Sequence, residues 1–200
     1  MPPKKTIREE MIIDAAFELV RKNGISAFSA RNIAKALNCS TQPVYSCFPT
    51  MKTLEQEVIQ RASEFVMEKY LLCKTEQVNN FKSIGLGYIA MARREKNLFD
   101  LLYVSGKVPL DFENHIFPID TDLLLSVMKR DTHLTDLSDD DLLDLLCHMW
   151  IYTHGLTVLT STNQSVSEEF IDNALEEMGH SVVLNKLMKK GVLNHEDFRD

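Results

Sequence analysis

The sequence predicts an all-α protein, and three observations support this class. Apolar residues recur three and four positions apart through most of the 200 residues, which is the spacing of a buried helix face. Several of these segments begin after residues that cap helices: Ser29, Thr50 and Ser138. The first segments are short and the last two are long. We therefore expect a small three-helix domain over residues 1–53, followed by a helical bundle over residues 54–200.

A chain of this length can bury a proper core without disulfide bonds. Its four cysteines show no CxxC or Cys/His ligand spacing, so we expect reduced, packed thiols: Cys39, Cys47, Cys73 and Cys147. A redox switch built on Cys39 and Cys47 is the alternative interpretation. No charged leader precedes an apolar run, and no apolar stretch approaches the roughly 18 residues of a membrane span. The sequence thus predicts a soluble cytoplasmic protein with no membrane partner.

The charges are distributed unevenly along the chain. The formal net charge is −7, but residues 1–53 hold eight basic and four acidic side chains, a local charge of +4 that leaves −11 on the remainder. A basic first quarter on an acidic body suits a protein whose N-terminal part meets a polyanion. An ordinary fluctuation in charge is the alternative.

The first two helices are indicated by their start and stop signals. Thr6 to Glu9 has the form of a capping box, and Gly24 supplies a C-terminal stop. Between them one face is apolar: Met11, Ile12, Ala15, Ala16, Leu19 and Val20. Ser29 can cap a second, short helix with an inner face of Ile33, Ala34 and Leu37, and Asn38 is a plausible left-handed residue at its end.

The stretch ALNCSTQPVYSCF stops one helix and starts another. Ser40 or Thr41 can accept hydrogen bonds from the free amides of a third helix, roughly residues 41–48, and Pro43 falls in its first turn, where it removes no internal hydrogen bond. Val44 and Phe48 then face inward. Four polar or aromatic side chains remain to face outward: Thr41, Gln42, Tyr45 and Ser46. After Pro49, a longer fourth helix has an inner stripe of Leu54, Val58, Ala62, Phe65 and Val66.

Two short helices joined by a tight turn, the second presenting polar side chains, describe a helix-turn-helix. Residues 7–61 resemble the DNA-binding domain of the TetR/AcrR family of transcriptional regulators. The matching segments are IIDAAFELVRKNG, SARNIAKAL, CSTQPVYSCF and FPTMKTL. The chain departs from the family at three positions, because relatives often have lysine at Thr41, an aromatic residue at Cys47 and lysine at Met51.

The resemblance implies that the third helix lies in the major groove of double-stranded operator DNA. Thr41, Gln42 and Pro43 would then approach base edges, and Gln42 has the side chain best suited to read adenine. Tyr45 would bond a phosphate. The helix starts at Ser29 and Thr50 would direct amides toward phosphates. The full predicted DNA-binding set is Ser29, Arg31, Thr41, Gln42, Pro43, Tyr45, Ser46, Thr50 and Lys52. Lys4, Lys5 and Arg8 are either an arm that reaches a groove or a tail without a role.

The body is helical but less diagnostic. We expect helices around Phe81–Ala92, Leu98–Val104 and Leu123–Met128. Its aromatic and methionine side chains are candidates for a cavity that binds a small-molecule effector of open chemistry: Tyr88, Met91, Phe99, Tyr103, Met149 and Tyr152. Plain core packing is the alternative for each of them.

The last two long helices carry a candidate dimer interface. Trp150 and His154 lie four residues apart on one face of the first, and Gly155 and Gly179 stand inside the two helices. Each internal glycine costs about 1 kcal/mol relative to alanine, and close approach of another helix is the commonest reason for one. The W-x-x-x-H-G pattern is similar to one in the interface through which family members form homodimers. Packing within one chain is the alternative.

The resemblance implies a ligand-responsive repressor. One short recognition helix reads too few base pairs, whereas two related by a dyad read a pseudo-palindrome with half-sites about 34 to 36 Å apart. An effector could bind better to a dimer in which the two DNA-binding domains have another spacing. The repressor would then release the operator.

Other classes of function find less support. The sequence has no G-x-S-x-G, H-E-x-x-H, Walker loop or dinucleotide fingerprint, so we expect no enzyme and no cofactor. A di-iron centre needs two E-x-x-H motifs, and Glu177 to His180 is a single one. A metal effector held by Cys147, His148 and His154 is a weaker alternative. A protein-binding adaptor of the same fold with weak or no DNA binding is the remaining one.

Overall fold

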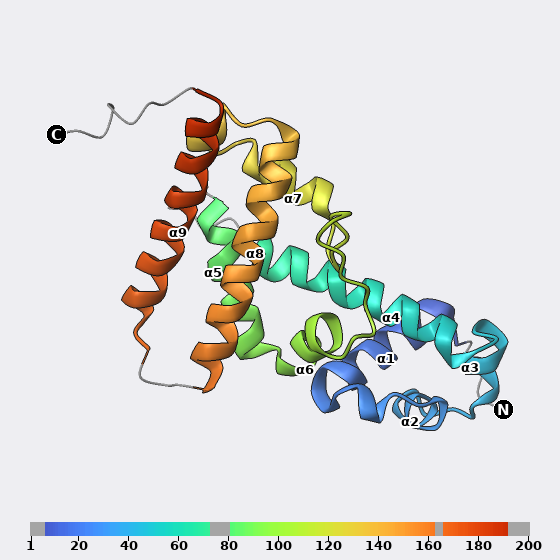
Figure 1. The fold of residues 1–200 in the computed structure, drawn as a ribbon. Coiled ribbons are helices and arrows are strands. Elements are labelled where there is room, and N and C mark those ends of the chain that lie inside the picture. The colour runs from blue at the N-terminus through green and yellow to red at the C-terminus, as the bar shows by residue number, and fades with distance from the viewer. Residues whose placement is uncertain (1–6, 73–80, 163–165, 192–200) are drawn as a thin grey trace. The chain divides into compact units, whose positions relative to one another are not determined.

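The computed structural model describes residues 7–72, 81–162 and 166–191 (Figure 1). The chain divides into two compact units. The first comprises residues 1–66 with 95–109, and the second comprises residues 67–94 with 110–200. Residues 95–109 thus fold with the N-terminal segment. The functional boundary after residue 53 remains a proposal, because compactness and function need not divide the chain at one residue.

The first unit is built from helices in the order that the sequence predicts. Their bounds are α1 (Glu9–Asn23), a 3₁₀ turn (Ile25–Ala27), α2 (Ala30–Ala36), α3 (Gln42–Cys47), α4 (Met51–Val66), α6 (Lys96–Phe99) and a π-helical turn (Asp100–Val104). Five side chains from α1 to α4 form its innermost core: Ile12, Ile33, Val44, Leu54 and Val58. The predicted inner faces are therefore confirmed at these positions.

Local capping explains where these helices start and stop. Ser29 Oγ accepts from Asn32 N at 3.2 Å, and Thr50 Oγ1 accepts from Thr53 N at 3.2 Å, so both predicted caps are confirmed. Gly24 (φ 79°) and Asn38 (φ 54°) have the positive φ angles that end α1 and α2.

Two predicted caps differ from the structure. Thr6 lies outside the described residues, and α1 begins at Glu9 after Arg8, whose side chain makes no capping bond. Thr41 is the N-cap of α3, but its side chain makes no capping bond, so of the two predicted candidates, Ser40 and Thr41, the second was wrong. The reason is local: Thr41 already has helical angles (φ −73°, ψ −13°), and the N2 position is Pro43, which has no N–H to donate.

The second unit is a helical bundle in which α8 and α9 run side by side (Figure 1). Its elements are a π-helical turn (Met67–Leu71), α5 (Phe81–Arg94), α7 (Thr121–Met128), a 3₁₀ turn (Thr132–Leu134), α8 (Asp139–Thr162) and α9 (Glu168–Lys189). Ser138 Oγ accepts from Asp141 N, and Ser167 Oγ accepts from Phe170 N at 3.1 Å, which confirms the predicted starts of the two long helices.

Helix α8 is more apolar than the sequence analysis expected. Residues Asp139–Ser161 are long and apolar enough to cross a membrane by length and composition alone. Half of the most apolar window is buried inside the protein, and α8 packs against α5, α7 and α9. The helix therefore has the character of the central core helix of its unit.

Candidate DNA-binding surface and ligand cavity

Helix α3 presents polar and aromatic side chains outward. Val44 and Phe48 are buried beneath it, whereas Gln42, Tyr45 and Ser46 are exposed, as the sequence predicts. Tyr45 is 53% exposed, which is high for a large aromatic residue and leaves its hydroxyl accessible to a partner. The arrangement displays an aromatic and an amide group on a short, rigid element.

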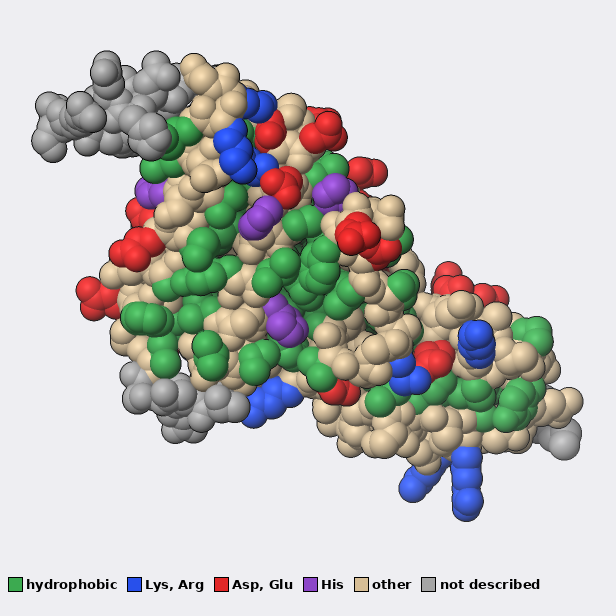
Figure 2. Space-filling model, in the orientation of Figure 1, with side chains coloured by type: hydrophobic (Ala, Val, Ile, Leu, Met, Phe, Trp, Pro, Cys, Tyr) green, Lys and Arg blue, Asp and Glu red, His purple; other side chains and the backbone are tan. Residues whose placement is uncertain are grey.

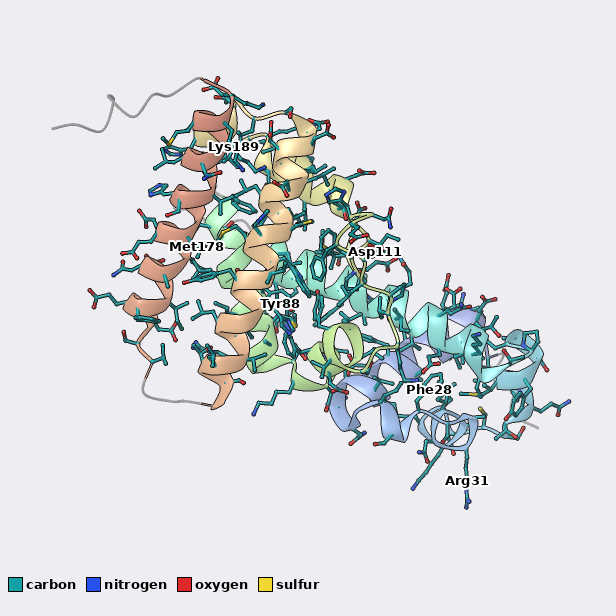
Figure 3. The ribbon with its side chains drawn as sticks, viewed as in Figure 1. Phe28, Arg31, Tyr88, Asp111, Met178 and Lys189 are labelled. Carbon is teal, nitrogen blue, oxygen red and sulfur yellow. The ribbon has the colours of Figure 1, made fainter. Side chains whose placement is uncertain are left out.

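Basic side chains flank this helix within the first unit. Arg31 on α2 and Lys52 at the start of α4 are exposed, and Arg31 points away from the body of the unit (Figure 3). Long basic side chains also project into solvent in the space-filling view (Figure 2). Lys35, one turn after Arg31, is exposed as well, and the sequence analysis missed it. Its i, i+4 spacing from Arg31 was the available signal.

The other predicted DNA-binding residues have polar groups that are less available to a partner. Ser46 Oγ donates to Gln42 O at 2.9 Å, so its hydroxyl proton is used within α3. Thr50 and Thr53 bond one another at 2.8 Å. Pro43 and Ser29 are half-buried, whereas Thr41 is exposed. The predicted DNA-binding residues lie on α2, on α3, at the start of α4 or just before these helices. Gln42, Tyr45, Arg31 and Lys52 offer the most accessible groups.

A cavity of about 560 Å³ opens within the second unit, between α5, α7, α8 and α9. Its walls are mostly apolar or aromatic: Leu71, Phe81, Ile84, Gly85, Leu86, Tyr88, Ile119, Leu124, Leu134, Leu146, Met149, Trp150, Leu175, Gly179 and Val183. The polar lining residues are fewer: Lys82, Asp131, His133, Thr153, Asp172, Glu176 and His180. The volume lies within the range of sites for drug-sized molecules.

An ion-paired triad joins α5 and α9 at this cavity. Lys82 Nζ donates to Asp172 Oδ2 and to Glu176 Oε2, each at 2.7 Å. Burial opposes the charge of Lys82, but the hydrogen bonds to the two carboxylates outweigh burial and raise the pKa of Lys82. The same hydrogen bond lowers the pKa of Glu176. Lys82 and Glu176 are therefore held in their charged forms at neutral pH.

Asp131 contributes a buried side chain to another part of the cavity wall. Its Oδ2 accepts from Phe81 N at 3.1 Å, and its Oδ1 accepts from His133 N at 3.0 Å. The buried carboxylate thus caps two helical segments at once, which fixes the start of α5 beside the 3₁₀ turn.

The predicted pocket residues separate into two groups. Tyr88 and Met149 line the cavity. Met91 is fully buried core, and Tyr152 is half-buried on α8 outside the lining. Phe99 and Tyr103 pack against each other in the first unit, with ring centroids 5.6 Å apart. These four residues lie outside the lining of this cavity, since an aromatic or methionine side chain is equally suited to a solid core.

Three of the predicted dimer residues face the interior of the second unit instead. Trp150 and Gly179 line the cavity. The hydroxyl of Tyr88, labelled in Figure 3, lies 2.8 Å from His154 Nδ1. The rings of Trp150 and His154 stack with centroids 5.1 Å apart, and burial lowers the pKa of His154. These three residues thus make contacts within one chain, and their part in a dimer stays a prediction.

The outer face of α8 and α9 is apolar and exposed. Gly155 lies there, since a Cβ on it would meet nothing within 4 Å. The exposed apolar side chains near it along α8 are Ile151, Val158 and Leu159, and Phe170 is exposed on α9. Figure 2 shows hydrophobic side chains gathered over α8 and α9 in this view. Exposed apolar residues that cluster on two adjacent helices are typical of an interaction surface.

The cysteine and histidine side chains bear on the alternatives of a metal effector and a redox switch. No group of three His, Cys, Asp or Glu side chains there is arranged to hold a metal ion. Cys39 and Cys47 are half-buried free thiols, and Cys147 is buried, which raises the pKa of its thiol. Cys73 lies outside the described residues.

Comparisons with known proteins agree with this architecture. A family model described as "Bacterial regulatory proteins, tetR family" matches residues 12–58. A crystal structure of a TetR-family transcriptional regulator from Streptomyces coelicolor is similar over 89% of this chain and 95% of that chain, with a TM-score of 0.52 and 20% sequence identity. This structural likeness concerns the fold alone. No curated protein matches the chain significantly.

Proposed function

Because the chain belongs to the TetR family of transcriptional regulators, we propose that it is a cytoplasmic repressor that binds a pseudo-palindromic operator as a homodimer. The observation that carries this proposal is the outward display of Gln42 and Tyr45 on α3 over a fully buried Val44. A short helix with these side chains can enter the major groove, where an amide reads a base edge and a phenol bonds a phosphate.

Basic residues around α3 would position the protein on the DNA backbone. Arg31, Lys35 and Lys52 are exposed around α3 and would neutralise phosphates on either side of the groove. The second unit carries most of the negative charge and would stay away from the polyanion. Affinity should therefore come from the first unit and depend strongly on salt.

The exposed apolar face of α8 and α9 supports the dimer. Packing this face, which includes Gly155 and Leu159, against its own copy would bury it in a four-helix arrangement related by a two-fold axis. A two-fold axis in the protein then requires a two-fold relation between the operator half-sites.

The cavity of the second unit supports an effector. A ligand that binds more tightly to the non-matching arrangement of the two DNA-binding units shifts the population away from DNA. Coupling of about 1 to 3 kcal/mol corresponds to roughly 5- to 150-fold in operator affinity.

Selection of bound duplexes from a random pool tests the proposal. The purified full chain is mixed with the pool at moderate salt, and the retained duplexes are sequenced. Enrichment of an inverted repeat is the expected result. A folded dimer that enriches no motif, and whose DNA affinity does not fall with salt, would overturn the proposal in favour of a protein-binding adaptor.

A further inference from the structure

We propose that the cavity of the second unit binds an amphiphilic amine, whose apolar body lies between α5, α8 and α9 and whose ammonium group pairs with Asp172 and Glu176. This inference rests on the proposed function, since it names the chemical class of the effector. It concerns binding, however, and can be tested without DNA.

The walls of the cavity define the apolar part of the ligand. Ile84 on α5, Leu146 on α8 and Leu175 on α9 contribute aliphatic surface from three sides. Gly85 also lines the cavity, and a Cβ there would lie 3.4 Å from Leu175 Cδ1, so the walls from α5 and α9 approach each other closely at this point. A ring or short chain of a few carbons would be taken out of water there, which favours binding.

The charges of the cavity wall define the polar part of the ligand. Asp172 and Glu176 stand one turn apart on α9 and both accept from the one ammonium group of Lys82. Two carboxylates with one lysine leave a net charge of −1, and Asp131 adds a further carboxylate to the lining, with bonds from Phe81 N and His133. The remaining titratable lining groups are His133 and His180. A second ammonium group would balance the excess charge and relieve the repulsion between like charges at i, i+4.

The polar groups are accessible to a ligand. The side chains of Asp172 and Glu176 are 45% and 51% exposed, whereas Lys82 is 21% exposed. An incoming ammonium group can therefore reach the carboxylates from the solvent side while Lys82 stays in place.

An anionic ligand fits less well. Its only lysine partner in the lining would be Lys82, whose ammonium group already donates to two carboxylates at 2.7 Å. A carboxylate from a ligand would have to displace one of them and would then face the excess negative charge of the other lining groups.

The protein carries its own reporter for this test. Trp150 is the one tryptophan in the sequence and lines the cavity. Its fluorescence reports occupancy directly, and thermal stabilisation by a ligand gives a second measurement.

Three matched probes differ only in the polar end: phenylbutylamine, phenylbutanol and phenylbutanoate. Each is titrated into the full-length protein at about pH 8, where histidine side chains are largely neutral. We expect the amine to bind at least about fivefold more tightly than the alcohol, and the alcohol more tightly than the carboxylate. Equal affinities, a preference for the carboxylate, or no binding of any probe would overturn the inference.

Variants identify the groups responsible. Asp172→Asn combined with Glu176→Gln should abolish the preference for the amine over the alcohol. The matched control is Glu168→Gln, because Glu168 pairs with Arg93 and also joins α9 to α5, yet neither residue lines the cavity. An amine preference that survives the double substitution, or that Glu168→Gln abolishes equally, would contradict the assignment.

The Lys82→Gln variant should affect the affinity for an amine and the affinity for an anion in opposite directions. Removing the competing ammonium group should tighten amine binding several-fold, because both carboxylates lose their internal partner. If Lys82 instead anchored an anion, this variant would weaken phenylbutanoate binding and leave the amine unaffected.

The outcomes separate this inference from the proposed function. Amine binding without any effect on operator affinity would support the cavity chemistry and refute release by this ligand class. An operator selected from the random pool, together with no amine preference, would refute the cavity chemistry alone.

Discussion

Arg21 holds Glu95 in a two-pronged ion pair across 74 positions of the chain. Arg21 Nε and Nη2 donate to the two carboxylate oxygens at 2.8 and 2.7 Å, and the guanidinium group lies 4.6 Å above the ring of Phe65. Asn97 Nδ2 donates to Arg21 O at 2.9 Å. These contacts join the end of α1 to the start of α6, and they explain why residues 95–109 fold with the first unit.

Arg21→Met should destabilise the first unit by about 3 kcal/mol, because it removes the guanidinium group from a carboxylate that is 7% exposed. The hydrogen bond with Glu95 also raises the pKa of Arg21, so the guanidinium group is charged in the wild type. Urea unfolding measures the change. The control is Lys22→Met, whose partner Glu18 lies in an exposed pair, and it should cost under about 1 kcal/mol. Equal costs for the two variants would show that the pair with Glu95 adds nothing.

Gly87→Ala should destabilise the second unit by at least about 2 kcal/mol. A Cβ at this position would lie 2.1 Å from the backbone oxygen of Tyr70, and a backbone atom cannot move aside as the end of a side chain can. Gly179→Ala is the matched control, since its Cβ would lie 3.9 Å from Met149 Cε and helix propensity favours alanine by up to about 1 kcal/mol. Urea midpoints of the two variants should move in opposite directions, and a stable Gly87→Ala protein would refute the close approach.

Gln42→Ala should relax base preference at one position in each half-site, at a cost of about 1 to 3 kcal/mol for the preferred base. Tyr45→Phe should weaken binding to all duplexes about equally, because its hydroxyl is assigned to a phosphate. Binding to a panel of single-base operator variants distinguishes the two effects. Unchanged sequence preference in Gln42→Ala would mean that α3 is wrongly placed in the groove.

Leu159→Asp should convert the proposed homodimer into monomers. Leu159 is 67% exposed on α8 beside Val158, and a carboxylate there would be buried without compensation in a self-packed interface. Analytical ultracentrifugation over a range of concentrations measures the change. Leu123→Asp serves as the control, because Leu123 is 40% exposed on α7. A dimer that tolerates Leu159→Asp would place the interface elsewhere.

The ion pairs between the start of α8 and the end of α9 should stabilise the fold in a pH-dependent way. Hydrogen bonds from Lys190 and Lys186 hold the pKa values of Asp141 and Asp144, respectively, below their ordinary range. A lowered folded-state pKa means that the unfolded chain binds more protons. The stabilisation is therefore fully present above about pH 4 and is lost as the pH falls through the folded-state values.

Asp141→Asn tests this directly. The variant should be less stable than the wild type at neutral pH, and the difference should shrink as the pH is lowered from about 4 to about 2. Asp140→Asn, at the exposed neighbouring position, should show no such convergence. Stability differences that stay constant with pH for Asp141→Asn would refute the role of this ion pair.

Helix positions and the outward face of α3 were predictable from the sequence, because capping and periodic burial act within a few residues. Ser29, Thr50, Ser138 and Ser167 each accept a bond from an amide three positions ahead. Where the local prediction failed, at Thr41, the cause was also local: helical backbone angles and a proline at N2.

The tertiary structure decided which partners meet across long stretches of chain. Arg21 meets Glu95, Lys82 meets Asp172 and Glu176, and neither pairing has a local signal. The direction of Trp150 and His154 also depended on tertiary packing, because α8 is apolar on more than one side and its periodicity does not select an inner face. The sequence by itself therefore determined the helices and their ends, while the cavity and the exposed face of α8 and α9 arose when α5, α8 and α9 packed together, since packing alone sets which side of a two-sided apolar helix is buried.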